Sequence, residues 1–300
     1  MSITEAYPQI NTFLDYLKFE KRYSQYTIIS YQNDLEQFFG FLMSQFDAPA
    51  IEKITGSFVR SWLAELKGDE MTAKSINRKI SSLKSFFKHQ MKTGVVTETP
   101  MAVIISPKIS KRLPSFVEEK DIDTLFEHVT FTDDWKGRTE RLVLQLFYST
   151  GMRLSELINL KETQIDPSYQ QIKVLGKGNK ERILPVEKGL MDDLQLYVAD
   201  KHAEFKLQVS NIFVNEKGKP LQARSVYGFV KQYLSQVTTI QKKSPHILRH
   251  SFATHLMNHG ADLNAVKELL GHSSLAATQV YTHNTIEKLK EVFNKAHPKA

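Results

Sequence analysis

Apolar residues recur at helical spacing throughout the first third of the chain. One such stretch runs from Ile10 to Phe19 and a second from Thr27 to Phe41, and neither contains a proline. A third runs from Ser57 to Leu66 and is soon followed by a glycine, a residue that commonly ends helices. A fourth runs from about Thr72 to Lys92. Residues 1–105 are therefore predicted to form a domain of four helices.

The fourth predicted helix has two chemically different faces. At about 100° per residue, its apolar side chains fall on one arc, which we expect to be buried: Ile76, Ile80, Leu83, Phe86, Phe87 and Met91. Its basic side chains fall on another arc: Lys74, Arg78, Lys84, Lys88 and Lys92. Most lysine-rich helix faces are simply solvated. The alternative is that this face follows the phosphates of DNA, and the pattern alone leaves both interpretations open.

Prolines and basic residues interrupt the periodicity after this helix. The segment 106–114 contains two prolines, is positively charged at Lys108, Lys111 and Arg112, and has no acidic residue. We interpret it as an extended linker, which either lies along a DNA backbone or only connects two domains. A length of 300 residues also suits two domains better than one.

Residues 115–300 return to helical periodicity, with one short change of period. Between the helices, residues 171–175 and 182–186 alternate with a period of two on either side of a glycine-containing turn, which is typical of a β-hairpin. The helical stretches are expected at 115–128, 141–149, 153–160 and from 189 almost to the end of the chain. The predicted fold class is therefore mainly α with a small antiparallel β-sheet (α+β).

Charge and cysteine content narrow the possible functions. The formal net charge of +7 suits a polyanionic partner such as DNA, although many basic proteins bind no nucleic acid. With no cysteine, the chain has no disulfide, no thiol nucleophile and no cysteine-ligated zinc. No apolar run approaches the roughly 20 residues of a membrane helix, and the first residues lack a signal-peptide pattern. We expect a cytoplasmic protein.

Six dispersed polar side chains in the second domain are candidates for a functional site: Arg153, Lys177, His246, Arg249, His272 and Tyr281. Each has an ordinary explanation when taken alone. Arg153 and Glu156 are three residues apart on one helix face, as in a structural ion pair. Lys177 lies in the hairpin turn, where a lysine usually serves solubility but where its ammonium also has reach.

The local phrases around these residues resemble the tyrosine recombinase, or phage integrase, family. They are Thr-Gly-Met-Arg-Leu-Ser-Glu-Leu at 150–157, Gly-Lys-Gly-Asn-Lys-Glu-Arg at 176–182, His-Ile-Leu-Arg-His at 246–250, Leu-Leu-Gly-His at 269–272 and Tyr-Thr-His at 281–283, all in family order. The N-terminal half is similar to the family's SAM-like core-binding domain, and the chain looks most like the Xer-type recombinases. Met152 and Ala277 stand where leucine and threonine are common.

The resemblance implies a two-domain DNA clamp that cuts and rejoins DNA without cofactors. Tyr281 would be the nucleophile that forms a 3′-phosphotyrosyl link, with His246 as its hydrogen-bonding partner or base. Lys177 would protonate the departing 5′ oxygen. One phosphate ester is exchanged for another, so no ATP is needed, and the chain contains no GxxxxGK[ST] phosphate loop. No metal is expected either.

The same resemblance assigns the remaining site residues to the charge on the phosphate. Attack builds negative charge on the non-bridging oxygens, and cations placed in advance stabilise it most in the transition state. Arg153 and Arg249 would bind these oxygens as bidentate forks, which lysine cannot do. His272 would add a third donor, and Glu156 would hold Arg153 without reacting.

The implied partners are double-stranded DNA with specific recombination sites and further recombinase protomers. Strand exchange would pass through a Holliday junction in a homo- or hetero-tetramer, with a paralogous recombinase and a DNA translocase as further partners in chromosome dimer resolution. Integration of a mobile element is the alternative. Arg224 and Lys231 are candidate DNA contacts. An apolar stripe on a short C-terminal tail helix packs on its own domain or docks on a neighbouring protomer: Ile286, Leu289, Val292, Phe293 and Ala296.

Three other interpretations are weighed against this one. His246 and His250 are four residues apart, as are His255 and His259, which is a spacing used by helical zinc ligands, but no HExxH motif is present. A DNA-binding module without catalysis would explain the basic helix and linker alone. A type IB topoisomerase shares the tyrosine chemistry but would relax supercoils without preferring a site.

Overall fold

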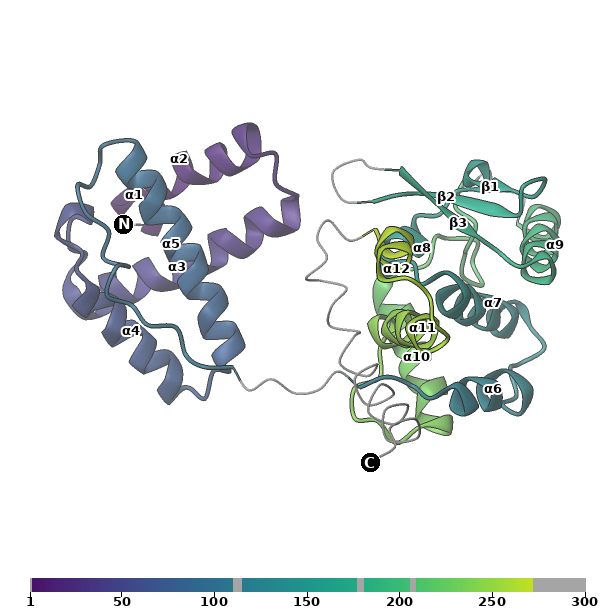
Figure 1. Ribbon diagram of the computed structural model, residues 1–300. Coiled ribbons are helices and arrows are strands. Elements are labelled where there is room, and N and C mark those ends of the chain that lie inside the picture. Colours follow the sequence, from purple (N-terminus) through teal and green to yellow (C-terminus); the bar gives the residue numbers. More distant parts are fainter. Residues whose placement is uncertain (1, 110–114, 177–180, 206–208, 272–300) are drawn as a thin grey trace, which may run out of the picture. The chain divides into compact units, whose positions relative to one another are not determined.

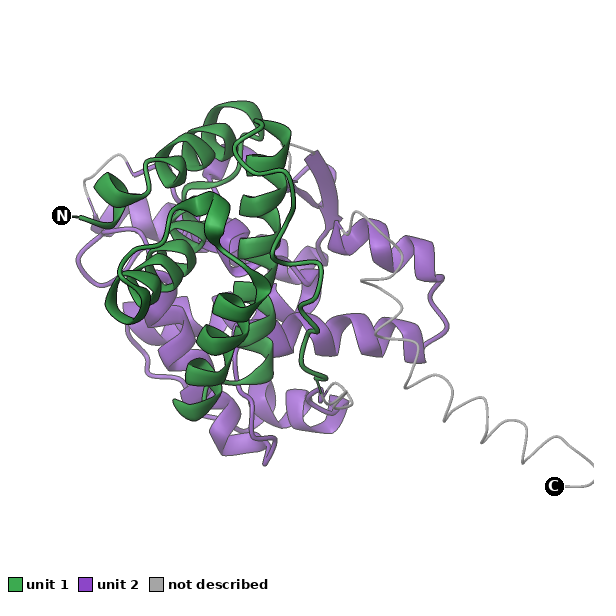
Figure 2. Cartoon of the chain, turned by 90° about the vertical axis from the view of Figure 1, so that its left-hand side faces the viewer, with its two compact units in different colours: residues 1–111 green, residues 112–300 purple. Residues whose placement is uncertain are grey.

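The computed structural model describes residues 2–109, 115–176, 181–205 and 209–271 of the 300-residue chain. It divides the chain into two compact units, residues 1–111 and 112–300, which Figure 2 shows in different colours. The division falls inside the proline-rich basic segment 106–114. Among the described residues, the helices are too short or too polar to span a lipid bilayer.

The first unit is helical throughout its described part. Its α-helices and short 3-10 and π turns follow one another along the chain (Figure 1): α1 Ile3–Ala6, α2 Gln9–Asp15, a π turn Tyr16–Glu20, α3 Gln25–Phe46, a 3-10 turn Ile51–Lys53, α4 Gly56–Gly68 and α5 Ala73–Lys92. Ser24 and Thr72 start α3 and α5 because their hydroxyls accept hydrogen bonds from backbone N–H groups of the first turn. The core between the helices is rich in fully buried aromatic rings: Phe13, Phe38, Phe39, Trp62, Phe86 and Phe87.

The two faces of α5 are nearly as the sequence predicts. Five of the six predicted core residues are buried, and all five residues of the basic stripe are exposed. Met91 is the exception, because it lies in the last turn of α5 and 41% of it is exposed. The sequence pattern also misses Lys79, which is only 6% exposed and whose ammonium lies 3.0 Å from the Asp34 carboxylate on α3.

In its described part, the second unit packs seven helices together with a small sheet at one side of them (Figure 1). The helices are α6 Glu119–Glu127, α7 Trp135–Thr150, α8 Leu154–Ile158, α9 Lys188–Glu204, α10 Ala223–Val237, α11 Pro245–Asn258 and α12 Leu263–Leu270, with a 3-10 turn at Glu162–Gln164. The antiparallel strands β1 Ile165–Asp166, β2 Gln171–Leu175 and β3 Glu181–Pro185 lie in that order in the sheet. The predicted fold class is confirmed. Within the sheet, only the two-residue strand β1 was not expected. The expectation of helix from residue 189 onward is wrong between α9 and α10, where residues 209–222 are not helical and Val214 pairs with Pro220 in an antiparallel bridge.

Helix α7 runs through the core of the second unit and packs against α9, α10 and α11 (Figure 1). It begins six residues before the expected start, because the Asp134 carboxylate caps it by accepting a hydrogen bond from the Gly137 N–H at 2.7 Å. It ends at Gly151, as expected, where φ is +58°. Helix α12 packs against both α11 and β3 and ends at Gly271, where φ is +61°. These two glycine-terminated helix ends lie at the candidate site.

Candidate active site

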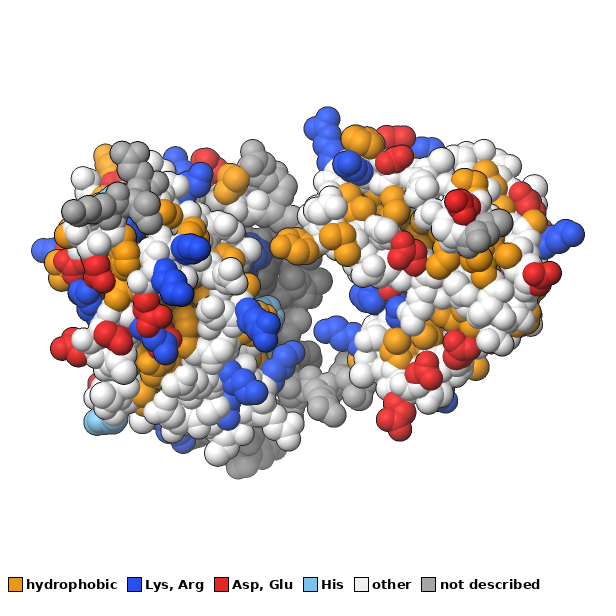
Figure 3. Space-filling view, turned by 180° about the vertical axis from the view of Figure 1, so that it is seen from behind, with side chains coloured by type: hydrophobic (Ala, Val, Ile, Leu, Met, Phe, Trp, Pro, Cys, Tyr) orange, Lys and Arg blue, Asp and Glu red, His pale blue; other side chains and the backbone are white. Residues whose placement is uncertain are grey.

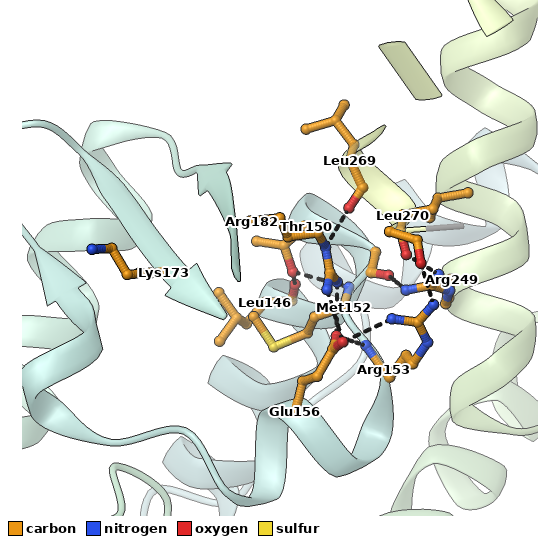
Figure 4. Close-up of polar contacts among 12 residues, drawn as sticks. Leu146, Thr150, Met152, Arg153, Glu156, Lys173, Arg182, Arg249, Leu269 and Leu270 are labelled. Carbon is orange, nitrogen blue, oxygen red and sulfur yellow. Dashed lines mark hydrogen bonds and ion pairs between the residues drawn. The ribbon is translucent and has the colours of Figure 1, made fainter. Parts of the chain in front are cut away.

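The C-terminal end of α12 is a meeting point for three arginine side chains (Figure 4). The last carbonyl groups of a helix have no partner inside the helix, and they form the negative end of its dipole. Each of these carbonyls accepts a hydrogen bond from a different guanidinium: Leu269 from Arg182 at 2.7 Å, Leu270 from Arg249 at 2.6 Å and Gly271 from Arg153 at 2.8 Å. Arginines from three separate segments are therefore oriented by one helix end.

Arg153 is positioned by the start of α8. Its backbone is extended at the N-cap of this helix, and its N–H donates to the Glu156 carboxylate at 2.7 Å. Its guanidinium donates to the same carboxylate at 2.8 Å, so the ion pair that the three-residue spacing predicts is present. The Arg153 side chain is still 32% exposed, whereas the Glu156 side chain is only 5% exposed.

Arg249 approaches the same place from α11. Only 3% of it is exposed, and its guanidinium bridges the ends of two helices by donating to the Gly151 carbonyl at 2.6 Å and to the Leu270 carbonyl. Gly151 must be small here, because a Cβ atom would lie 2.3 Å from the Phe252 ring. Arg249 and Arg153 donate to consecutive carbonyls of α12, so the structure brings the two predicted arginines together.

Glu156 forms ion pairs with two arginines. Its carboxylate accepts a bidentate pair of hydrogen bonds from Arg182 at 2.8 and 2.7 Å, in addition to the bonds from Arg153. Burial alone raises the pKa of Glu156, but the hydrogen bonds from Arg182 and Arg153 outweigh it and hold the pKa below its ordinary value. The carboxyl group is therefore ionised at neutral pH.

Arg182 is a residue of this site whose role the local sequence pattern does not predict. The alternation along β3 offers a signal for it: Arg182 and Leu184 share the face that turns toward the core, while Ile183 between them is 53% exposed. An arginine on the inner face of a strand needs an internal partner. Its partner, Glu156, is 26 residues away, so spacing does not reveal it.

The family matches fall into two parts that correspond to the two compact units of the structure. Residues 115–288 match the phage integrase family, and residues 10–94 match the N-terminal SAM-like domain of phage integrases. The chain belongs to the phage integrase family. The resemblance read from the five local phrases is thus confirmed, and the chain is an enzyme that cleaves and rejoins DNA.

Its relatives include tyrosine recombinases named XerC. The tyrosine recombinase XerC of Bacillus licheniformis is 38% identical over 295 residues, which cover 97% of this chain and 96% of the relative. The XerC of Oceanobacillus iheyensis is 39% identical over 296 residues, with coverage of 97% and 96%. Among solved structures, XerH recombinase bound to a palindromic difH substrate in a post-cleavage complex has a TM-score of 0.76 at 22% identity, over 94% of this chain and 83% of that chain.

His246 lies in the first turn of α11, after Ser244 and Pro245, and is exposed. Arg249 follows it one turn later in the same helix. The next histidine, His250, is buried, and its pKa is lowered to about 4 first by burial and then by the neighbouring His246 and His255. Lys177, His272 and Tyr281 lie outside the described residues, as do the tail-helix residues.

The predicted DNA contacts that are described all lie at the protein surface. Lys74, Lys84, Lys88, Lys92 and Lys108 in the first unit and Arg224 and Lys231 on α10 are exposed. On the face of the second unit drawn in Figure 3, Lys and Arg side chains are scattered, with Asp and Glu side chains also present. Arg78 is half exposed but is also ion-paired with the fully buried Asp34, so it has a structural role as well. Lys111 and Arg112 lie outside the described residues.

One of the two histidine pairs considered as zinc ligands, His255 and His259, has other neighbours in the structure. His255 Nδ1 lies 3.0 Å from the Tyr148 hydroxyl, and His259 Nε2 lies 3.4 Å from the Glu119 carboxylate. Within the described ranges, no three His, Asp or Glu side chains converge as a metal site requires.

Proposed function

We propose that this chain recombines DNA at specific paired sites through a covalent link to Tyr281, as an Xer-type recombinase in chromosome dimer resolution. One observation carries the proposal. Arg153 and Arg249, which are 96 positions apart in sequence, donate to the adjacent carbonyls of Gly271 and Leu270. Two guanidinium groups held side by side suit a single phosphate, whose non-bridging oxygens take up charge as it is attacked.

The surroundings of the two arginines support pre-organisation. Both guanidinium groups are oriented by protein atoms before DNA is present, so little reorganisation remains for the chemical step. Arg249 donates to the backbone carbonyls of Gly151 and Leu270, which orient its guanidinium. Arg153, which is one third exposed, reaches the surface from which a phosphate would approach.

The remaining roles follow the family assignment. Tyr281 attacks the phosphorus and forms the 3′-phosphotyrosyl link, His246 assists in removing its proton, and Lys177 protonates the 5′ oxygen that leaves. His272, which follows Gly271 in the chain, is the third donor to the phosphate. We further propose that four protomers act on two DNA sites through a Holliday junction, either alone or with a paralogue and a DNA translocase.

The decisive experiment compares the wild-type chain with Tyr281→Phe. A DNA site is first obtained by selecting cleaved sequences from a random library with the wild-type protein, and a nick is then placed so that the cleaved strand cannot be resealed. Wild-type protein should form an adduct that survives a denaturing gel. Tyr281→Phe should bind the same DNA with unchanged Kd and form no adduct, because phenylalanine has no hydroxyl.

The matched control is Tyr169→Phe, which removes an exposed hydroxyl between β1 and β2 and should leave adduct formation unchanged. An adduct formed by Tyr281→Phe would refute the assignment of the nucleophile. Relaxation of supercoils without preference for a site, and without recombinant products from paired sites, would show a topoisomerase instead.

A further inference from the structure

We propose that Arg182 is a positioning residue of this site, which ties the Glu156 carboxylate of α8 to the end of α12 and thereby holds Arg153 in its working orientation. The inference rests on the proposed function, because it assigns a purpose to the geometry of Arg153. It concerns a side chain of β3 whose described hydrogen bonds go to Glu156 and to the Leu269 carbonyl.

The guanidinium of Arg182 makes three short hydrogen bonds in two directions. Its Nη1 and Nη2 donate to the two oxygens of Glu156 at 2.8 and 2.7 Å, and its Nε donates to the Leu269 carbonyl at 2.7 Å. This is the parallel two-bond geometry that an arginine forms with a carboxylate and that a lysine cannot reproduce. The Arg182 side chain is only 10% exposed, so these bonds are largely shielded from water.

The position of Arg153 depends on that arrangement. Oxygen Oε1 of Glu156 accepts from Arg153 Nη1 and from Arg182 Nη1, both at 2.8 Å, so the two arginines share one acceptor atom. Without Arg182, the carboxylate would keep Arg153 as its described charged partner and would be able to turn about its side-chain bonds. Arg153 would then lose the rigid acceptor that orients it.

The end of α12 depends on Arg182 as well. A Cβ atom at Gly271 would lie 3.1 Å from Arg182 Cδ, which shows how closely the glycine backbone packs against this side chain. The same guanidinium also holds the Leu269 carbonyl, two residues before the Gly271 carbonyl that Arg153 contacts. Removing Arg182 therefore loosens both acceptors of Arg153, one on α8 and one on α12.

Arg182 differs from Arg153 in its partners. All three nitrogen atoms of its guanidinium donate to protein acceptors, and two of them pair with the carboxylate that also holds Arg153. Burial alone does not make this distinction, since only 3% of Arg249 is exposed. We therefore expect it to act on the phosphate only through Arg153.

The first test measures adduct formation by full-length Arg182→Lys and Arg182→Gln on the nicked DNA site selected with wild-type protein. At saturating DNA, the single-turnover rate should fall on the order of 10- to 100-fold, because small displacements of a supporting group cost about that much. The Kd for DNA should stay within about twofold. The control is Arg138→Gln, which breaks a 2.7 Å arginine–carboxylate pair with Asp200 on the outer surface of the same unit and should leave the rate unchanged.

A second measurement separates positioning from simple loss of structure. Replacing one non-bridging oxygen of the scissile phosphate by a methyl group removes the negative charge that the arginines are proposed to stabilise. The rate loss of Arg182→Lys should then shrink several-fold, in parallel with that of Arg153→Lys. If Arg182 only stabilises the fold, its loss will be the same on both substrates, and the inference is overturned.

The outcomes also distinguish this inference from the proposed function. Wild-type rates for both Arg182 variants, with Arg153→Lys inactive, would overturn the role of Arg182 and leave the proposed function standing. A wild-type protein that forms no adduct with any selected DNA would overturn the proposed function and the inference together. If Arg182→Gln does not fold, Arg182→Lys, which retains the charge, gives the answer.

Discussion

Replacing Glu156 with glutamine is the sharpest perturbation of this site, because it removes one charge and hardly changes the shape. The carboxylate accepts four hydrogen bonds: two on Oε1, from Arg153 Nη1 and Arg182 Nη1, and two on Oε2, from the Arg153 backbone and Arg182 Nη2. Glutamine presents an NH2 group in place of one oxygen. Whichever way the amide turns, two of the four donors then face another donor.

The cost of this change can be estimated from the bonds that are lost. Hydrogen bonds to charged groups contribute about 1.5–3 kcal/mol each, which gives about 3–6 kcal/mol for two. Arg153 is one third exposed, so water screens part of the effect and the estimate falls to about 2–4 kcal/mol. For a unit the size of residues 112–300, this corresponds to a decrease in Tm of about 4–16 °C.

Thermal and urea unfolding of Glu156→Gln and of the control Glu181→Gln test the estimate. Glu181 is 62% exposed and lies 3.8 Å from Lys173, so its replacement should change stability by less than about 0.5 kcal/mol. A Glu156→Gln protein as stable as the control would refute the claim that the four bonds act together.

The same variant has a defined dependence on pH. The folded-state pKa of Glu156 is lowered, so its ionised form stabilises the fold above the unfolded-state pKa, and this stabilisation is lost as pH falls through the folded-state pKa. The stability difference between wild type and Glu156→Gln should therefore be full at pH 7 and shrink below about pH 4. A difference that stays constant across this range would contradict the lowered pKa.

Two further predictions concern the scaffold. Asp34→Ala should destabilise the first unit by about 3–5 kcal/mol in urea unfolding, because it leaves the buried Lys79 ammonium without its carboxylate. The combined replacement of Asp34 by leucine and Lys79 by methionine should recover most of that loss. A residue other than glycine at positive φ costs roughly 1–2 kcal/mol of stability. Gly151→Ala should destabilise the second unit by more than this, because the new Cβ atom would also meet the Phe252 ring. Gly260→Ala, with φ +88° and open space around it, should show the backbone cost alone.

The secondary structure was predictable where the signal is local. The helical periods of α3 and α5 and the alternation of β2 and β3 depend on neighbours a few residues away, so the sequence shows them directly. The early start of α7 was not predictable in this way. Residues 135–140 include a glycine and several polar residues, and the helix extends over them because of the Asp134 cap.

The candidate site was predictable only in part, for the same reason. Arg153 and Glu156 are three residues apart, so their ion pair follows from helix geometry. The bond between Arg182 and Leu269 joins residues 87 positions apart, and its acceptor is a backbone carbonyl. Every residue has such a carbonyl, so no residue type marks the acceptor in the sequence.

The use of a helix end to hold the arginines has a consequence for catalysis. An arginine held only by carboxylates would be well oriented, but the carboxylates would largely neutralise its charge before a phosphate binds. Arg153 and Arg249 donate to carbonyls of α12, which carry only partial charges, and Arg153 shares with Arg182 the one carboxylate described in this cluster, Glu156. On the proposed function, the described excess of positive charge would attract the phosphodiester and then stabilise its transition state.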